Sequence, residues 1–351
     1  IFIIKIYSSI MLVKGVYMKV TIKDVAKAAN VATSTVSRVL SNNEKISDET
    51  KARVFEAIKK LNYKPNAIAR SLANKKRHML GVVLPNEAQD LISNHFFIEA
   101  MKGMSLYAQS MNYFITYAFS KDEDDESNYV EELCNSSLVD GICLLRAKEK
   151  DKTIEFLKEK EFPFVVIGRP EDTAETLWVD NDNFKASYDL NERIIKKGLK
   201  NIVFVGGRVQ WNVTKDRYNG YKMAHEVNCV SFDENYVLID EDCCENTGYR
   251  LISEFLKSGK KFDAVFTTDD LLAIGVLKKL NEEKIKNITV TGFNNIPLAS
   301  YQNPPLASMD INAQELGYRA TKLLIDSLEG IKNPNKHFIV NCDFIERESF
   351  Y

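Results

Sequence analysis

The 351-residue chain has few of the residues that build metal centres or disulfide frameworks. Its six cysteines form no CxxC pair and show no spacing typical of zinc ligands, and its four histidines are scattered. We therefore expect reduced thiols, no metal and no cofactor. The sequence also lacks glycine-rich phosphate loops, the nucleophile motif GxSxG and the zinc motif HExxH. No residue set supports an enzyme.

Long apolar runs are absent as well. Residues 1–17, IFIIKIYSSIMLVKGVY, are interrupted by Lys5 and Lys14 and are shorter than the ~20 apolar residues that cross a bilayer. They do not end in the small-residue cleavage site of a signal peptide. We expect a non-native or disordered extension outside the fold, followed by a folded protein that begins at Met18. No other segment could span a membrane, so we expect a cytoplasmic protein with no membrane partner.

Charge is distributed unevenly along the chain. Residues 18–78 carry 14 basic and 5 acidic side chains, a net charge of +9, whereas residues 79–351 carry 31 basic and 44 acidic side chains, a net charge of −13. The average over the whole chain is only −2. A small basic segment joined to an acidic body fits a nucleic-acid contact that is confined to the basic segment.

The basic segment begins with two short helical patterns joined by a turn at Asn30, a residue type that tolerates the left-handed conformation. The apolar residues recur at helical spacing and form one face: Ile22, Val25, Ala26, Ala29, Val36, Val39 and Leu40. Polar residues occupy the exposed start of the second helix: Thr33, Ser34, Ser37 and Arg38. Short polar side chains with one arginine suit the major groove of DNA.

A third helix is predicted after Ser47, which can cap it, with Asp48 and Glu49 in the first turn where the helix dipole favours negative charge. Its apolar stripe consists of Val54, Ala57, Ile58 and Leu61. Pro65 is suited to starting a further helix, which is short and therefore marginal in isolation.

Residues 79–351 alternate short strand-like runs with amphipathic helical patterns. The strand-like runs are Leu80–Leu84, Tyr113–Phe119, Gly141–Leu145, Phe164–Ile167, Ile202–Val205, Tyr236–Ile239, Ala264–Thr267 and Ile288–Thr291. This alternation predicts an α/β region of parallel sheets with helices on both faces. Eight or more strands indicate two sheets in two subdomains, with a ligand between them at the carboxyl ends of the strands.

Three segments occur in a specific order: TIKDVAKAANVATSTVSRVL, LNYKPNAIARSLA and MLGVVLP. With them the chain resembles the lactose-repressor (LacI-type) family of bacterial transcription regulators from residue 18 to about residue 349. The resemblance implies a small all-α helix-turn-helix DNA-binding head (18–64), a hinge helix and linker (65–78) and a two-lobed effector-binding and dimerisation domain (79–351). That domain would be a periplasmic-binding-protein type I core of two doubly wound subdomains. The implied N-subdomain is 79–178 and 309–338, and the C-subdomain is 179–308 and 339–351, with crossings near Trp178, Ser308 and Phe338.

The resemblance also implies the DNA contacts. Base edges would be read by Thr33, Ser34 and Arg38, and phosphates would be held by Thr21, Ser37, Asn42 and Lys45. In the hinge the implied residues are Asn66, Ala69 and Leu72. Leu72 would wedge into the minor groove, and the small Ala69 would let the backbone come close.

For the effector, the segment DRYNGY (216–221) resembles the family's pocket arginine segment and implies Arg217, whose fork matches neighbouring hydroxyls of a sugar. Where the family usually has Asn-Asp this chain has Asp269-Asp270, and Asn294 stands where the family usually has Asp. One position gains a carboxylate and another loses one, which leaves the ligand open.

Aromatic faces for a sugar ring are expected from Phe96, Trp211 and Trp178, and Arg169 and Asp180 lie at strand ends that should face the cleft. The segment VVIGRPED…WVDNDNF most resembles maltose-operon repressors. The resemblance implies a homodimeric repressor on pseudo-palindromic operator DNA, released by a small neutral sugar such as maltose or a maltodextrin. The alternative is a corepressor-dependent global regulator that responds to a purine or a phosphoprotein. A secreted sugar receptor is disfavoured by the basic head and the missing signal peptide.

Overall fold

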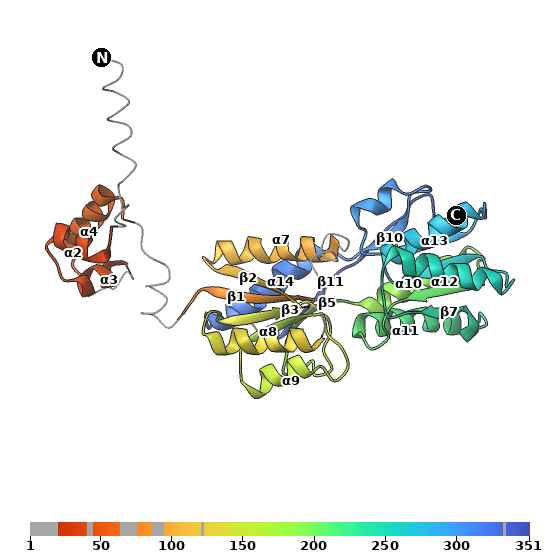
Figure 1. Cartoon of the computed structure of the whole chain (residues 1–351), viewed down its shortest axis with the longest axis horizontal. Helices are drawn as coiled ribbons and strands as arrows, with labels where there is room; N and C mark the ends of the chain where they lie inside the picture. The colour runs from red at the N-terminus through yellow and green to blue at the C-terminus, as the bar shows by residue number, and fades with distance from the viewer. Residues whose placement is uncertain (1–19, 41–44, 64–75, 86–94, 121–122, 333–334) are drawn as a thin grey trace, which may run out of the picture. The chain divides into compact units, whose positions relative to one another are not determined.

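The computed structural model describes residues 20–40, 45–63, 76–85, 95–120, 123–332 and 335–351. By its internal contacts the chain divides into two compact units, residues 1–77 and 78–351 (Figure 1). The expected extension 1–17 and four of the expected DNA contacts lie outside the described residues: Asn42, Asn66, Ala69 and Leu72. In the described part of the chain, no helix has the length and apolar character that a membrane span requires.

In the residues of the first unit that the structure describes there are three helices, α2 (Ile22–Ala29), α3 (Thr33–Leu40) and α4 (Asp48–Leu61). Asn30 adopts the left-handed conformation (φ 53°) at the turn between α2 and α3, as predicted. Ser47 caps α4 by accepting the Thr50 backbone N–H at 3.4 Å, as predicted. The three helices share one small core, whose fully buried members are Val25, Val36 and Val54. The predicted apolar stripes therefore face inward and leave the polar side of α3 exposed.

The second unit begins with a six-stranded, all-parallel sheet in the order β11-β5-β4-β3-β1-β2. Its strands are β1 (Met79–Pro85), β2 (Phe114–Ser120), β3 (Gly141–Leu144), β4 (Phe164–Ile167), β5 (Leu177–Asn181) and β11 (His337–Val340). One face packs against α7 (His95–Ser110) and α14 (Ala313–Leu328), and the other packs against α8 (Glu123–Ser136) and α9 (Lys152–Glu159) (Figure 1). We call this part the first lobe.

The second lobe is built on another six-stranded sheet, in the order β12-β10-β9-β8-β6-β7. Its strands are β6 (Ile202–Gly206), β7 (Val237–Ile239), β8 (Ala264–Thr267), β9 (Thr289–Phe293), β10 (Ala307–Asp310) and β12 (Asp343–Ile345). Among the described strand pairs of this sheet, only β10–β12 is antiparallel. The helices pack in two pairs: α10 (Asn183–Lys196) with α11 (Asn212–Val227), and α12 (Glu245–Lys257) with α13 (Asp270–Glu282).

The chain crosses between the lobes three times, after β5, after β10 and after β11. Trp178, Ser308 and Phe338, near which we expected the crossings, lie inside these three strands, so each crossing comes a few residues later than expected. The crossings come later because the chain leaves each sheet only after the last backbone hydrogen bonds of the strand. The side-chain amide of Asn181 donates to the Ile311 and Val340 carbonyls, both at 3.0 Å, and so joins all three crossings.

Candidate functional site

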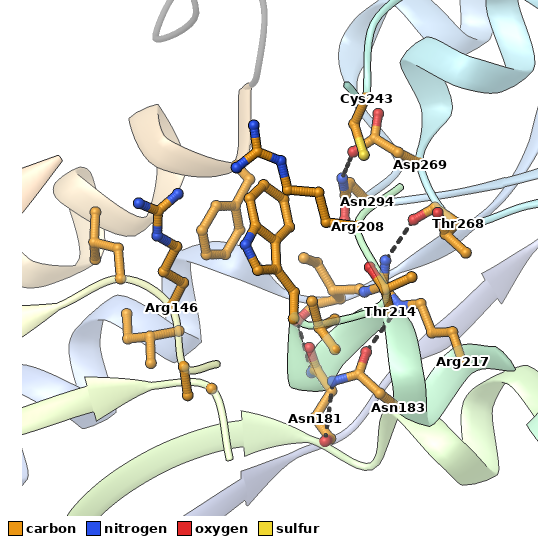
Figure 2. A pocket seen from close by; sticks show the side chains of 18 of the residues that line it. Arg146, Asn181, Asn183, Arg208, Thr214, Arg217, Cys243, Thr268, Asp269 and Asn294 are labelled. Carbon is orange, nitrogen blue, oxygen red and sulfur yellow. Dashed lines mark hydrogen bonds between the residues drawn. The ribbon is translucent and has the colours of Figure 1, made fainter. Parts of the chain in front are cut away.

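A cavity of about 440 Å³ lies between the two lobes. It is lined at the carboxyl ends of strands from both sheets, where the sequence placed it: residues 145–147 follow β3, Asp180 and Asn181 end β5, and Asn294 follows β9. Six of the eight residues that the sequence analysis expects in the cleft line it: Phe96, Asp180, Trp211, Arg217, Asp269 and Asn294. Figure 2 shows the labelled polar residues of its wall.

Arg217 lies in this wall on α11, and hydrogen bonds hold its side chain in place. Its side chain is buried, Nε donates to Asn183 Oδ1 at 2.9 Å, and Nη1 donates to the Thr268 carbonyl at 2.6 Å (Figure 2). The guanidinium also lies 4.1 Å from the centroid of the Phe293 ring. Burial lowers the pKa of Arg217, but a guanidinium stays charged in proteins. The remaining donors can bind hydroxyl oxygens in the cavity.

Asp269 and Asn294 form a hydrogen-bonded pair near Arg217, which binds the carbonyl of the preceding Thr268. Asp269 is the N-cap of α13, where one carboxylate oxygen accepts the Leu271 N–H at 2.8 Å and the other accepts the Asn294 amide at 2.7 Å (Figure 2). Burial raises the pKa of Asp269 to about 6. Relative to the family pattern the carboxylate and the amide have exchanged positions, but they still form a hydrogen bond with each other.

The neighbouring carboxyls have different environments. Asp270 is fully buried and is not among the lining residues; it accepts the Ser308 hydroxyl at 2.6 Å and the Ile296 N–H at 2.8 Å. Asp180 lines the cavity and accepts three protein N–H groups, from Arg169, Asn181 and Asn183. Burial raises the pKa of Asp180 to about 6.

At another part of the wall, Trp211 lies between cationic side chains from both lobes. The guanidinium of Arg146, from the first lobe, is 5.4 Å from its ring centroid, and that of Arg208, from the second, is 5.6 Å away. Arg146 is paired with the buried Glu126 at 2.7 Å, and Arg208 Nε donates to the Glu241 carbonyl at 2.9 Å. These arginines therefore have protein partners before any ligand binds.

Two sequence expectations for the cleft are not met. Arg169 is not among the lining residues, because its guanidinium is bound by both oxygens of Asp216. Trp178 is packed in the core of the first lobe, stacked on His337 at 4.8 Å, with its indole N–H donating to the Thr173 carbonyl. Arg169 follows the carboxyl end of β4, but its side chain is held by Asp216, whereas Trp178 lies near the amino end of β5, away from the edge that lines the cavity.

The cavity also contains polar residues that the sequence did not single out: Arg146, Asn181, Asn183, Arg208, Thr214, Cys243 and Thr268. Asn181 is the last residue of β5 and Asn183 the first of α10, and the position of their segment VDNDNF at the end of a strand was an available signal. Cys243 is half-buried beside Asp269, and loss of solvent contact is the main cause that raises its pKa to about 12. Within the described ranges, no group of three or more His, Cys, Asp or Glu side chains could hold a metal ion.

The head presents the expected polar surface on α3, with Thr33, Ser34, Ser37 and Arg38 all exposed; Lys45 is exposed too. Thr21 is different. Its backbone N–H and its hydroxyl both donate to the Asp24 carboxylate, at 2.8 and 2.7 Å, and these bonds lower the pKa of Asp24. The donors with which Thr21 was expected to hold a phosphate are thus occupied at the start of α2.

The similarity of this chain to known proteins identifies its family. Residues 21–66 match the model of the bacterial regulatory proteins of the lacI family, and residues 192–350 match that of the periplasmic binding protein-like domain. The HTH-type transcriptional regulator MalR of Streptococcus pneumoniae is 38% identical over 320 residues, covering 91% of this chain and 95% of that protein. The chain belongs to the lacI family.

Two further lacI-family relatives bear on function and fold. Catabolite control protein A of Priestia megaterium is 30% identical over 281 residues, covering 79% of this chain and 83% of that protein. A solved LacI-type transcriptional regulator from Bacillus cereus is 31% identical, with a TM-score of 0.75, covering 78% of this chain and 98% of that one. The chain is accordingly a DNA-binding transcriptional regulator with a helix-turn-helix region and a periplasmic-binding-protein type I core, and its family is not one of enzymes.

Proposed function

We propose that this regulator represses a maltose or maltodextrin operon and that a small neutral sugar, bound in the cavity, releases it from the operator. The 38% identical relative is a MalR regulator, and VVIGRPED…WVDNDNF resembles the corresponding segment of maltose-operon repressors. The proposal includes a homodimer on a pseudo-palindromic operator in the cytoplasm.

The observation that carries the sugar assignment is the balance of donors and acceptors in the wall. Arg217 offers only donors, Asp269 at neutral pH only acceptors, and Asn294 and Asn183 have amides with both. The arginines of the wall already bind protein partners. A ligand whose hydroxyls both donate and accept can satisfy such a surface, whereas a phosphate would meet repulsion from Asp269.

On DNA, we propose that Arg38 donates to a guanine edge while Thr33 and Ser34 contact neighbouring bases. Ser37 and Lys45 would hold phosphates and set the register, with Asn42 as a further phosphate contact. Asn66, Ala69 and Leu72 would enter the minor groove, with Leu72 as the wedge. The exposure of the polar side of α3 supports this assignment.

A release assay on operator DNA tests the proposal with maltose, maltotriose, glucose 6-phosphate and hypoxanthine. We expect release by maltose or maltotriose, and a response roughly 5- to 150-fold weaker in Arg217→Ala, since a lost partner to a buried hydroxyl costs ~1–3 kcal/mol. Lys222→Ala is the matched control: it lies exposed on the same helix, with its ammonium over Phe232. Tightening by hypoxanthine, or release only by the sugar phosphate, would favour the corepressor-type alternative, which the 30% identity to catabolite control protein A keeps open.

A further inference from the structure

Beside the cavity, the two lobes are joined by contacts that involve no crossing strand. On the first lobe they come from the loops after β3 and β4, and on the second from the loop after β6 and the first turn of α11. Four backbone or amide contacts lie here: the Lys148–Trp211 bridge, Glu149 N–H to the Gln210 carbonyl, Asn212 N–H to the Ala147 carbonyl, and the Asn212 amide to the Arg169 carbonyl.

Two ion pairs flank these contacts, and each joins one lobe to the other. Arg169 binds Asp216 through a fork, with Nη2 at 2.5 and 2.7 Å from the two oxygens and Nε at 3.2 Å. Lys215 pairs with Glu149. The side chain of Asp216 is only 12% exposed, so its charge is compensated here largely by Arg169. Fork-shaped, charge-assisted pairs are stronger and more specific in geometry than a single exposed ion pair.

Both ion pairs lie next to residues that line the cavity. Asp216 directly precedes Arg217 on α11, and Trp211, Ala147 and Gly168, which line the cavity, border the same contacts. The lobes are also connected by the three crossings that Asn181 joins and by the contact of Arg146 with the Trp211 ring. A rotation about those crossings that separates the lobes would break both ion pairs while leaving each lobe intact.

We propose that Arg169, Asp216, Lys215 and Glu149 form an interlobe clasp that stabilises the closed cleft, and that Arg169 acts as a positioning residue rather than a ligand contact. The charges lose their partners when the lobes separate, so the clasp favours the closed state in the absence of ligand. An effector that binds the closed cleft then gains apparent affinity in proportion to the closed population. The gain in effector affinity rests on the proposed function, whereas the stabilisation of the closed cleft does not.

The chain provides its own reporter of closure, because it has two tryptophans. Trp211 lies in the clasp region, and Trp178 is buried inside the first lobe. In a Trp178→Phe background the emission therefore reports Trp211 alone. We compare Arg169→Gln with the parent, without ligand, by emission maximum and acrylamide quenching. Lys158→Gln is the matched control, since it removes a cation paired with Asp172 within the first lobe.

Breaking the clasp should shift Trp211 emission to longer wavelength and raise its quenching constant at least about twofold, as expected for a population moved toward the open state. Arg169→Lys should give a smaller change, because it keeps the charge but not the fork. Lys158→Gln should leave both signals unchanged. Equal signals in the parent and Arg169→Gln would overturn the clasp, whatever ligand the cavity binds.

A double-mutant cycle tests whether Arg169 and Asp216 act as a pair or independently. If Arg169 and Asp216 act together, Asp216→Asn combined with Arg169→Gln should change Trp211 quenching no more than the larger single change. Additive changes would overturn the pairing. For whichever sugar releases the parent protein, Arg169→Gln should weaken binding roughly tenfold. If no sugar binds the parent, the proposed function fails, and the ligand-free signals still decide the clasp.

Discussion

The substitution Asp269→Asn separates the effect of one buried charge on stability from its effect on effector binding. The substitution nearly preserves the shape of the side chain and can still cap α13, since asparagine is a good N-cap. It removes the negative charge that faces Arg217 and that accepts the Asn294 amide at 2.7 Å. We expect the variant to be more stable than the parent but to bind its effector less tightly.

The gain in stability follows from the pKa of Asp269, which burial raises from 3.8 to about 6. The folded state therefore holds this proton more tightly than the unfolded state does, and the carboxylate destabilises the fold above about pH 6. A shift of about two pKa units corresponds to at most about 3 kcal/mol at pH 7. The advantage of the variant should shrink as the pH falls below 6 and vanish below about pH 4, where the carboxyl is neutral in both states.

Binding should change in the opposite direction. Replacing a charged acceptor for a sugar hydroxyl costs ~1–3 kcal/mol, which weakens the effector affinity roughly 5- to 150-fold. In the parent, affinity should rise with pH through about 6 as Asp269 ionises, and the variant should lose this rise. Asp180, whose pKa is also raised to about 6, and Glu126, whose pKa burial also raises, are further sources of pH dependence.

Calorimetric titration of the releasing sugar and denaturant unfolding, both at pH 5, 6, 7 and 8, measure the two effects. Asp233→Asn is the control, since Asp233 is also an N-cap but is exposed and hydrogen-bonded to the Asn235 N–H, which lowers its pKa. It should not stabilise the protein and should not alter binding. An Asp269→Asn variant that is less stable at pH 7, or that binds the sugar as the parent does at every pH, would refute the reasoning.

Three further predictions concern the head and hinge. Arg38→Ala should cost ~1–3 kcal/mol of operator affinity and leave random-DNA affinity nearly unchanged, as measured by gel shift. Asn30→Ala should destabilise the head by about 1 kcal/mol because alanine is strained in the left-handed conformation, whereas Asn30→Gly should be nearly neutral; hydrogen exchange of the α2 and α3 amides checks both. Leu72→Ala should weaken operator binding more than random-DNA binding, and equal losses on both DNAs would contradict a wedge.

The local structure of this chain could be read from the sequence because it depends on local spacing. The stripe on α2, the left-handed Asn30 and the Ser47 cap each involve residues within one or two helical turns, and each occurs as expected. The carboxyl-end rule for parallel strands likewise predicted a ligand between the two sheets, and the cavity lies there. Arg217 and Asp269, which are 52 positions apart, were expected in that cavity from the resemblance to the family, and both line it.

Tertiary structure decided what depends on side-chain direction and on contacts between distant segments. Arg169 follows a strand end, as several cavity residues do, but Asp216 holds its side chain elsewhere, and Trp178 lies near the amino end of β5, stacked on His337. Of the adjacent Asp269 and Asp270, the first faces the cavity and the second is fully buried against Ser308. Neighbours in sequence can point to opposite sides of a helix start, and only packing determines which one reaches the ligand.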